Sequence, residues 1–478
     1  MSDFSSIFSD PSKNSYYFPI IIGIAAILLI IELSLLLIKE YKASQNQDLN
    51  ISMDNTLQNN MSYPSLMIIR KNNLKSRYLL AYLLARAAMW SKAPYIYTLF
   101  MTVHKFSFVE IGRLYLIDAI SAFFFGPITG QLADKYGRRR FCRYYNYSVI
   151  LNLLLRMQGE RWSAYLAQII TGFGTNLINT TFEAWVVSES ENDFMGYRKE
   201  ADRFRRKLFV KVNFYDEIIS ILILIICSIV YSYYGIYAPF WISIFFSLSS
   251  LFAIRIYWKE NLSLIKKENS LLEQIKEAMI EFKKVDVLCI GLIEGIILAC
   301  LNIFLFSWTP ILKQSTQGEM NPGLIFTSMT LAMIVGTKCC KVFIAYLNCD
   351  NYISIVVCSF LQGIFLFLTY YKDSFLSRLV LLCLFDGLIG FYNPLNSIIK
   401  SNILLEKYRA LLMNLFRVPL NIYVIIVLLT ISHLNPFTMA LISGLMCFLA
   451  FGIGLFLVIY ISFSPEKIDT NTFVIPII

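Results

Sequence analysis

The chain has 478 residues, of which 57% are hydrophobic, 15% are aromatic and only 15% are charged. A soluble protein of this length needs far more polar surface, so the composition excludes that class and indicates a protein that crosses a membrane several times. The formal net charge of +10 does not indicate nucleic-acid binding, because the basic residues lie between apolar segments, where they report membrane topology.

The first apolar run covers residues 18–38 and is long enough to span a bilayer. Lys39 and Lys42 follow this run, whereas a signal peptide carries its basic residues before the apolar run. We therefore predict that residues 1–42 hold an uncleaved anchor helix with its N-terminus outside the cytosol. Residues 43–76 begin with a stretch rich in Asn, Gln and Ser and are predicted to form a disordered cytosolic linker.

Twelve further apolar runs follow, and their length and composition predict membrane-spanning helices. They cover 78–101, 109–131, 141–157, 163–187, 208–231, 238–256, 286–309, 322–341, 352–371, 377–399, 410–432 and 437–461. We predict an N-terminal six-helix bundle (77–256), a C-terminal six-helix bundle (286–462) and a cytosolic tail (463–478). Thirty of the 42 lysines and arginines lie in the tail and in alternate connecting segments, which places the C-terminus in the cytosol.

The segment 257–285 separates the two groups of six runs. Leu271, Ile275, Met279 and Phe282 recur in it at helical spacing among lysines and glutamates. This pattern predicts an amphipathic helix that lies along the cytosolic face of the membrane and links the two bundles.

The short segment between the second and third runs reads Gly130-Gln-Leu-Ala-Asp134-Lys-Tyr-Gly137-Arg138-Arg139-Arg. Glycines allow two helix ends to approach closely, and an acid that ends one helix can pair with basic residues that begin the next. The run fits Gly-x-Leu-x-Asp-x-x-Gly-Arg-Arg/Lys and resembles the loop between the second and third helices of major facilitator transporters. We expect a cytosolic gating motif in which Asp134 and Arg138 latch neighbouring helix ends. The alternative is an ordinary basic loop.

A weak internal repeat supports two related halves. Residues 212–216, Val-Asn-Phe-Tyr-Asp, resemble residues 413–417, Met-Asn-Leu-Phe-Arg, and Ala93-Pro94 matches Thr309-Pro310. Transporters built from two similar bundles show such repeats. Asn213 and Asn414 hold matching positions in the repeat, and both are candidates for substrate binding.

Two arginines inside apolar runs are candidate anion ligands. A charge there is costly, so it faces an internal cavity or another charge. Arg417 precedes Pro419, which bends a helix, and a guanidinium offers a fork of donors that suits a tetrahedral oxyanion. Arg86 lies near the middle of its run and is a second candidate. The alternatives are a structural ion pair or contact with lipid headgroups. Lys92 is close enough to the end of its run to reach headgroups, and headgroup contact is the role that we expect for Lys211.

Acidic residues inside the runs are candidates for proton coupling, because a buried carboxyl group can hold a proton near neutral pH. The four candidates are Asp118, Glu183, Glu294 and Asp386. Their alternative role is to pair with a basic residue of the interior. Tyr95, near the end of its run, is a candidate to line a substrate pocket, although aromatic residues at such ends also anchor helices at the membrane interface.

Several other classes of site are unsupported. The ten cysteines and two histidines have no metal-ligand spacing. No Walker loop, GxSxG or kinase-type run is present, so we expect no cofactor, no metal and no enzymatic activity.

Further local strings carry a closer resemblance. They are Ala93-Pro-Tyr-Ile-Tyr97, Phe182-Glu-Ala-Trp185, Trp308-Thr-Pro-Ile-Leu312, Gly323-Leu-Ile-Phe-Thr-Ser328 and Asn414-Leu-Phe-Arg-Val-Pro-Leu420. In this order they resemble the molybdate-anion transporter family, the group that contains major facilitator domain-containing protein 5. The resemblance runs from about 77 to 461, and the additional N-terminal helix fits it. It implies uptake of molybdate, a dianionic tetrahedral oxyanion, across the plasma membrane.

Three positions depart from the family pattern. Met89 stands where members have an aspartate before the tryptophan, Thr171-Gly172 replaces a Gly-Arg pair, and Arg86 is an additional charge. These departures bear on substrate and coupling rather than on membership.

The sequence thus predicts an all-α polytopic membrane protein with the major facilitator fold, two six-helix bundles and one extra N-terminal transmembrane helix. We expect a secondary active transporter that takes up molybdate by alternating access. It would lie in a lipid bilayer and use protons as its coupling ion. One alternative is transport of another small anion, and a second is a membrane receptor or scaffold that does not transport.

Overall fold

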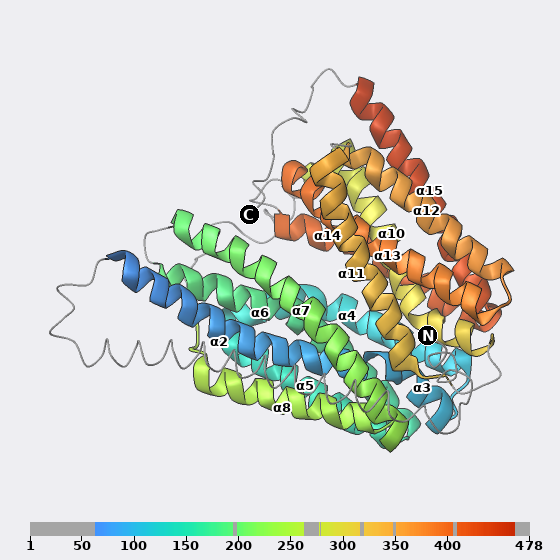
Figure 1. Cartoon of the computed structure of the whole chain (residues 1–478), viewed down its shortest axis with the longest axis horizontal. Helices are drawn as coiled ribbons and strands as arrows, with labels where there is room; N and C mark the ends of the chain where they lie inside the picture. The colour runs from blue at the N-terminus through green and yellow to red at the C-terminus, as the bar shows by residue number, and fades with distance from the viewer. Residues whose placement is uncertain are drawn as a thin grey trace, which may run out of the picture. The chain divides into compact units, whose positions relative to one another are not determined.

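The computed structural model describes residues 63–194, 198–261, 277, 279–315, 320–347, 350–404 and 409–463. The described residues are almost entirely helical (Figure 1). The long helices are α2 (Tyr63–Lys92), α4 (Phe108–Tyr136), α5 (Arg138–Met157), α6 (Arg161–Asp193), α7 (Arg198–Tyr234), α8 (Ala238–Tyr257), α10 (Val285–Lys313), α11 (Pro322–Leu347), α12 (Asn351–Tyr371), α13 (Phe375–Ile403), α14 (Arg409–Leu429) and α15 (Pro436–Phe463). The predicted apolar runs fall on these helices and the short turns that follow α2 and α14, which confirms the all-α class.

The first predicted run is not one uninterrupted α-helix. After α2 the chain continues through a 3₁₀ turn (Ala93–Tyr95), one α-turn (Ile96–Thr98) and a π-turn (Leu99–Val103). Pro94 lies in the 3₁₀ turn and has no backbone N–H, so it cannot continue the α-helical hydrogen bonds. This change of helix type places Lys92 and Tyr95 at a break in the helix.

The described residues form two compact units, and the start of α11 belongs to the first. Unit 1 holds the described residues before 267 and those of 318–330, and unit 2 holds those of 267–317 and those after 330. The Asn321 amide donates to the Ser228 carbonyl oxygen at 3.1 Å, and the rings of Trp90 and Phe326 lie 6.5 Å apart. These contacts attach the first part of α11 to helices of the N-terminal half.

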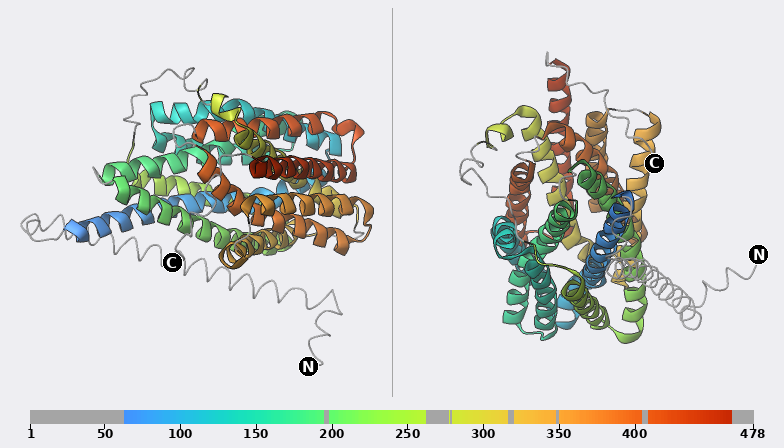
Figure 2. Two further views of the ribbon diagram at one scale, coloured as in Figure 1. Left: turned by 90° about the horizontal axis from the view of Figure 1, so that it is seen from above. Right: turned by 90° about the vertical axis from the view of Figure 1, so that its left-hand side faces the viewer.

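In unit 1, α2 packs against α7 and α8, and α6 packs against α4 and α5 (Figures 1 and 2). The core between them is rich in aromatic side chains. Tyr78, Phe182, Trp185 and Trp258 are each at most 2% exposed, and the rings of Trp185 and Trp258 stack with centroids 3.8 Å apart. Burial of such large apolar side chains stabilises the packing of these helices against one another.

In unit 2, α15 packs against both α10 and α12, while α13 packs on α12 and α14 on α10. Prolines lie inside three of its helices, at Pro310, Pro394 and Pro419. Each proline removes one backbone hydrogen bond of its helix. In a membrane protein such interruptions are tolerated where neighbouring helices or a polar interior satisfy the freed carbonyl group.

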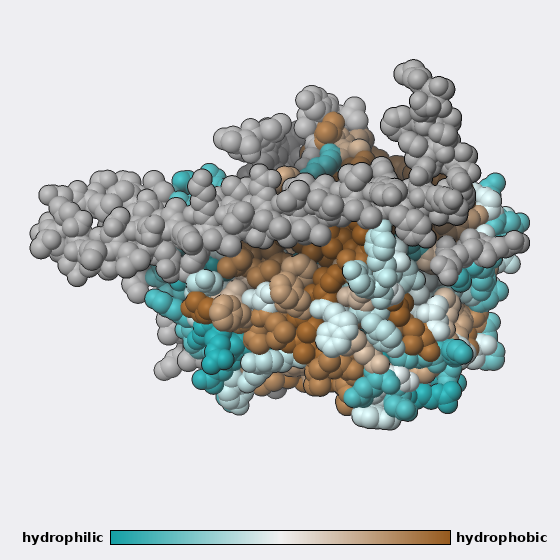
Figure 3. Space-filling model, turned by 60° about the horizontal axis from the view of Figure 1, so that its bottom comes forward, coloured by the Kyte–Doolittle hydropathy of each residue, from teal (hydrophilic) through white to brown (hydrophobic). Residues whose placement is uncertain are grey.

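The outer surface of these helices is apolar. Seven helices of the described residues are long and apolar enough to cross a membrane, judged by length and composition. On α8 the exposed large side chains recur every three or four residues, at Trp241, Phe245, Leu248, Phe252 and Ile256. Figure 3 shows hydrophobic side chains gathered over the middle of one face, with hydrophilic ones towards its edges. Such a surface suits lipid rather than water.

Some predicted segments lie outside the described residues. These are the anchor helix, the linker as far as residue 62 and the tail after residue 463. Residues 63–76 are helical, which corrects the prediction of disorder for that part. The reason is tertiary: Leu74 is fully buried, and Lys71 pairs with Glu200 at 2.9 Å. Of the amphipathic segment, Met279 and Phe282 are described and helical.

Candidate functional site

The predicted gating motif forms a hydrogen-bonded loop at the junction of α4 and α5. Gly137 separates the two helices with a φ of +112°, a conformation that L side chains rarely adopt. The Arg138 guanidinium reaches back to Asp134, with Nε 2.8 Å from Oδ1, and its Nη1 donates to the Ala184 carbonyl oxygen of α6 at 3.1 Å. Asp134 and Arg138 therefore tie α4 and α5 to α6, as an acid and a base across a tight helix junction can.

A second acid holds the other side of this loop. Glu260, just after α8, accepts from the Arg139 backbone N–H at 3.0 Å, and the Arg139 Nη2 donates to the Arg255 carbonyl oxygen at 2.7 Å. A Cβ atom at Gly137 would lie 2.5 Å from a Glu260 carboxylate oxygen. The backbone angle therefore favours glycine at 137, whereas the Glu260 carboxylate ends a flexible side chain that could move aside. Gly130 has open space around it.

The stacked tryptophans Trp185 and Trp258 extend the same network. The Trp185 indole N–H donates to the Lys259 carbonyl oxygen at 2.9 Å, and the Asn261 amide donates to Glu189 at 3.2 Å. Glu189 lies beyond the predicted span 163–187, and burial raises the pKa of its carboxyl group. The sequence identified the motif loop, but Glu260 and Glu189 were missed, because no local signal marks them as its partners.

Arg86 is paired within unit 1. Its Nε lies 2.9 Å from Asp216 Oδ1 and its Nη2 lies 2.6 Å from Oδ2, which is a bidentate pair between α2 and α7. The Trp90 indole N–H donates to the same carboxylate at 3.1 Å, and the Met89 sulfur lies 3.4 Å from Nη1. Both charged side chains are less than one fifth exposed. The charge of the guanidinium is therefore balanced by Asp216 inside the protein. This favours a structural ion pair over substrate binding as the role of Arg86.

Tyr95 is a packing residue rather than part of an open pocket wall. Its side chain is fully buried, and its ring lies 5.2 Å from that of Tyr231. A Cβ atom at Gly323 would collide with the hydroxyl groups of both Tyr95 and Ser228. The glycine is therefore what allows α11 to approach the end of α2.

A second group of charges lies in the interior of unit 1. Lys92 is 7% exposed and Arg156 is 2% exposed, and both interact electrostatically with Asp118 of α4. Lys92 lies near the end of its run, where a side chain can reach lipid headgroups, but the structure buries it in the interior. Arg156, near the end of its predicted run, was missed as an interior residue.

Helices α4 and α6 approach closely beside this group. A Cβ atom at Gly172 would lie 2.6 Å from the Ala122 backbone nitrogen and 2.7 Å from the Asp118 carbonyl oxygen. Any side chain at 172 would force the helices apart. Thr171, its neighbour, instead accepts a hydrogen bond from Arg156 Nη2 at 2.8 Å. The Thr171-Gly172 departure thus has a packing role in this chain.

In unit 2, Glu294 pairs with Lys400. The Lys400 ammonium lies 2.7 Å from Glu294 Oε1, and both side chains are close to nine-tenths buried. The second carboxylate oxygen, Oε2, is buried without a hydrogen-bond partner among the described residues. Asp386 is 7% exposed and likewise has no hydrogen-bond or ion-pair partner in the described part of the chain. Glu294 fits the pairing alternative, whereas Asp386 fits a protonatable carboxyl group.

Arg417 lies exposed on α14, and no hydrogen bond or ion pair engages it within the described ranges. Its neighbours pack inward: a Cβ atom at Gly295 of α10 would lie 3.0 Å from both the Phe416 carbonyl oxygen and the Pro419 Cβ. Asn414 is on the same helix. Glu183 and Asn213 are exposed on α6 and α7 of unit 1.

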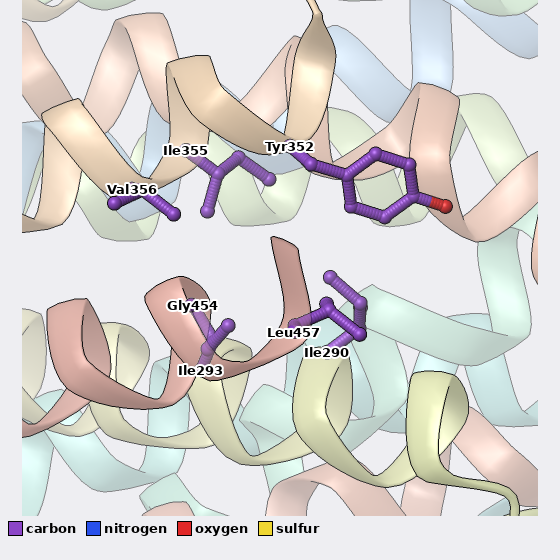
Figure 4. Close-up of a pocket in the computed structure, with 7 residues that line it drawn as sticks. All are labelled: Ile290, Ile293, Tyr352, Ile355, Val356, Gly454 and Leu457. Carbon is purple, nitrogen blue, oxygen red and sulfur yellow. The ribbon is translucent and has the colours of Figure 1, made fainter. Parts of the chain in front are cut away.

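A small apolar pocket lies between α10, α12 and α15 of unit 2 (Figure 4). It leaves no room for even a water molecule, so it is far smaller than a typical ligand pocket. Its lining comprises Ile290, Ile293, Tyr352, Ile355, Val356, Gly454 and Leu457. These side chains offer one hydroxyl group and no cation, so the pocket is unsuited to bind an anion.

Comparison with known proteins decides the family. A family model described as "Sugar-tranasporters, 12 TM" matches residues 65–377, more than half of the chain. The chain belongs to this family of the major facilitator superfamily. Its curated relatives include the molybdate-anion transporters of Takifugu rubripes, 24% identical over 73% of this chain and 77% of the relative, and of Danio rerio, 23% identical over 72% and 76%. The resemblance to the molybdate-anion transporter family is thereby confirmed.

Solved structures support the fold of this transporter. A mutant of the nucleoside transporter NupG matches with a TM-score of 0.66 and 14% identity, over 80% of this chain and 99% of that one. The D-xylose-proton symporter matches with a TM-score of 0.61 and 13% identity, over 84% and 99%. Family and fold together establish a multi-pass membrane transporter of the major facilitator type, and not an enzyme.

Proposed function

We propose that this transporter takes up a small tetrahedral oxyanion, molybdate, by alternating access, and that Arg417 is the main substrate contact. The relatives at 22–24% identity that bear the name molybdate-anion transporter support the choice of anion. The observation that carries the proposal is the state of Arg417 itself.

Arg417 is the candidate anion ligand whose positive charge is not balanced by an acidic residue among the described residues. A guanidinium in an apolar helix is costly in contact with lipid, so it requires a water-filled space or a partner of opposite charge. Arg86 has such a partner in Asp216, whereas Arg417 has none among the described residues. An oxyanion would supply the missing charge, and the planar guanidinium fork would bind two of its oxygens at once. Asn414, three residues earlier, is a candidate second donor.

The organisation of the transporter forms part of the proposal. We place an extra N-terminal helix in residues 1–42, two bundles at 77–256 and 286–462, and the joining segment at 257–285 along the cytosolic face. The lysine and arginine distribution supports an N-terminus outside the cytosol and a cytosolic C-terminus. The plasma membrane is the proposed location. The bonds of Asp134 and Arg138 support a latch that holds one conformation.

Protons are the proposed coupling ion. Asp386 supports this assignment, because it is a buried carboxyl group on α13 without a partner in the described residues. A carboxyl group in such surroundings favours its neutral, protonated form. Glu183 is exposed on α6 and is a second candidate, whereas Glu294 is occupied by Lys400.

Uptake of labelled molybdate in a molybdate-starved host tests the proposal. Arg417→Ala is expected to abolish high-affinity uptake, while Lys211→Ala, which removes an exposed charge on α7, leaves uptake unchanged. Uptake by Arg417→Ala at the wild-type level would remove Arg417 from the site. Competition by sulfate or tungstate separates molybdate from another small anion, and the absence of flux in liposomes would favour a receptor or scaffold.

A further inference from the structure

The interior of unit 1 holds three charges that the transport proposal does not use. Lys92 ends α2, Asp118 lies in the middle of α4 and Arg156 lies one residue before the end of α5. Each of the three interacts electrostatically with the other two. Lys92 and Arg156 are more than nine-tenths buried. We refer to Lys92, Asp118 and Arg156 as the interior cluster.

Several donors of the interior cluster have no acceptor. Arg156 Nη2 donates to Gln168 at 2.7 Å and to Thr171 at 2.8 Å, but its Nε and Nη1 are shut off from solvent without a partner among the described residues. Lys92 also has no hydrogen-bond partner in the described ranges. A buried donor without an acceptor loses the energy of its hydration. Two buried nitrogen donors of Arg156 therefore lack an acceptor, and the Lys92 ammonium group makes no hydrogen bond to a described residue.

The charges in the interior cluster do not balance. Lys92 and Arg156 each carry a positive charge when protonated, and Asp118 supplies one negative charge. The Asp118 Oδ1 is itself buried without a hydrogen bond in the described residues, so the carboxylate does not bind the free donors of Arg156. An uncompensated positive charge in a membrane-protein interior is costly. One monovalent anion among the free donors would balance the charge and supply the missing acceptor.

We propose that the interior cluster is a binding site for a small inorganic anion of the size and charge of chloride. The site differs from the proposed substrate contact Arg417, which lies on a helix of the other unit. A single excess charge matches a monovalent ion rather than a dianion, and donors that are shut off from solvent favour an ion that sheds its water readily. The bound anion would hold α2, α4 and α5 together.

Thermal unfolding of the purified full chain tests this site. The melting temperature is measured as chloride replaces gluconate at constant ionic strength and pH. A ligand that binds the folded state alone raises the melting temperature, and the rise grows with the logarithm of the ligand concentration above its Kd. At a chloride concentration ten times the Kd, we expect a rise of roughly 3–6 °C. Lys92→Met keeps the length of the side chain but removes the excess charge, so the chloride effect should disappear.

Three further variants sharpen the test. Asp118→Asn raises the excess charge of the interior cluster, so a given rise in melting temperature should be reached at a several-fold lower chloride concentration. Lys211→Met, on an exposed position of α7, should keep the wild-type response. Arg417→Ala should also keep it, even where molybdate uptake is lost, which separates this site from the proposed function.

The proposal is overturned by any of three results. One is the absence of any rise in the melting temperature of the wild-type protein as chloride replaces gluconate. Another is an equal effect in the wild type, Lys92→Met and Lys211→Met, which would be a general salt effect. The third is an Asp118→Asn variant that folds but responds to chloride no more strongly than the wild type, since the excess positive charge would then have no part in binding. This last measurement stands even if Lys92→Met fails to fold.

Discussion

Asp216 of α7 and Arg417 of α14 occupy matching positions of the internal repeat, but only Asp216 is paired with an opposite charge among the described residues. Asp216 is held by the Arg86 guanidinium through two contacts of 2.9 and 2.6 Å and by the Trp90 indole. Arg417 is exposed and engaged by no hydrogen bond or ion pair within the described residues. One half of the repeat thus carries a buried ion pair, and the other carries an exposed cation without a partner among the described residues, which we call the open cation.

The partner position explains the difference. When the repeat is extended from the matched prolines Pro94 and Pro310, Arg86 of α2 corresponds to Asn302 of α10. Asn302 is neutral, and its amide donates to the Leu298 carbonyl oxygen of its own helix at 2.8 Å. A neutral side chain bonded to its own helix cannot balance a guanidinium. The matched position thus lies in an ion pair in unit 1, whereas in unit 2 it has no such partner among the described residues.

Arg86→Met is the substitution with the largest expected effect on stability. It leaves Asp216 as an unpaired charge in a site less than one fifth exposed, and breaking a buried pair on one side costs about 3 kcal/mol or more. In a thermal unfolding experiment this corresponds to a fall in melting temperature of roughly 6–12 °C. The double variant Arg86→Met with Asp216→Asn should recover more than half of the loss. No recovery in the double variant would contradict a role for the ion pair itself.

Trp90→Phe should have a smaller effect of the same kind. The substitution removes the indole N–H that donates to Asp216 at 3.1 Å but keeps an aromatic ring beside Phe326. A hydrogen bond to a charged group contributes about 1.5 kcal/mol, so the melting temperature should fall by roughly 3–6 °C. If Asp216→Asn already removes the charge, Trp90→Phe should then cost less, and equal costs in the two backgrounds would argue against this hydrogen bond.

The sequence predicted the helices well, because long apolar runs and alternate basic loops are strong local signals. The sequence did not predict which charged residues pair with each other. Asp216 lies 130 residues from Arg86 and was one acid among several, so only the packing of α7 on α2 could select it. Arg156 and Lys92 both lie near the ends of their runs, where sequence indicates flanking residues, so hydropathy does not reveal that both are buried.

Arg417→Met is expected to change stability least and is the sharpest test of the comparison. An exposed side chain without a hydrogen bond or ion pair among the described residues contributes little to folding, so the change should be within about 0.5 kcal/mol. The same variant should lose labelled molybdate uptake, because the open cation is the proposed anion contact. Thermal unfolding is measured on the purified variant. Uptake is measured in cells that express the variant and the wild type at equal levels on their surface. A fall in melting temperature as large as that of Arg86→Met would mean that Arg417, too, has a structural partner, and the two halves of the repeat would then be alike.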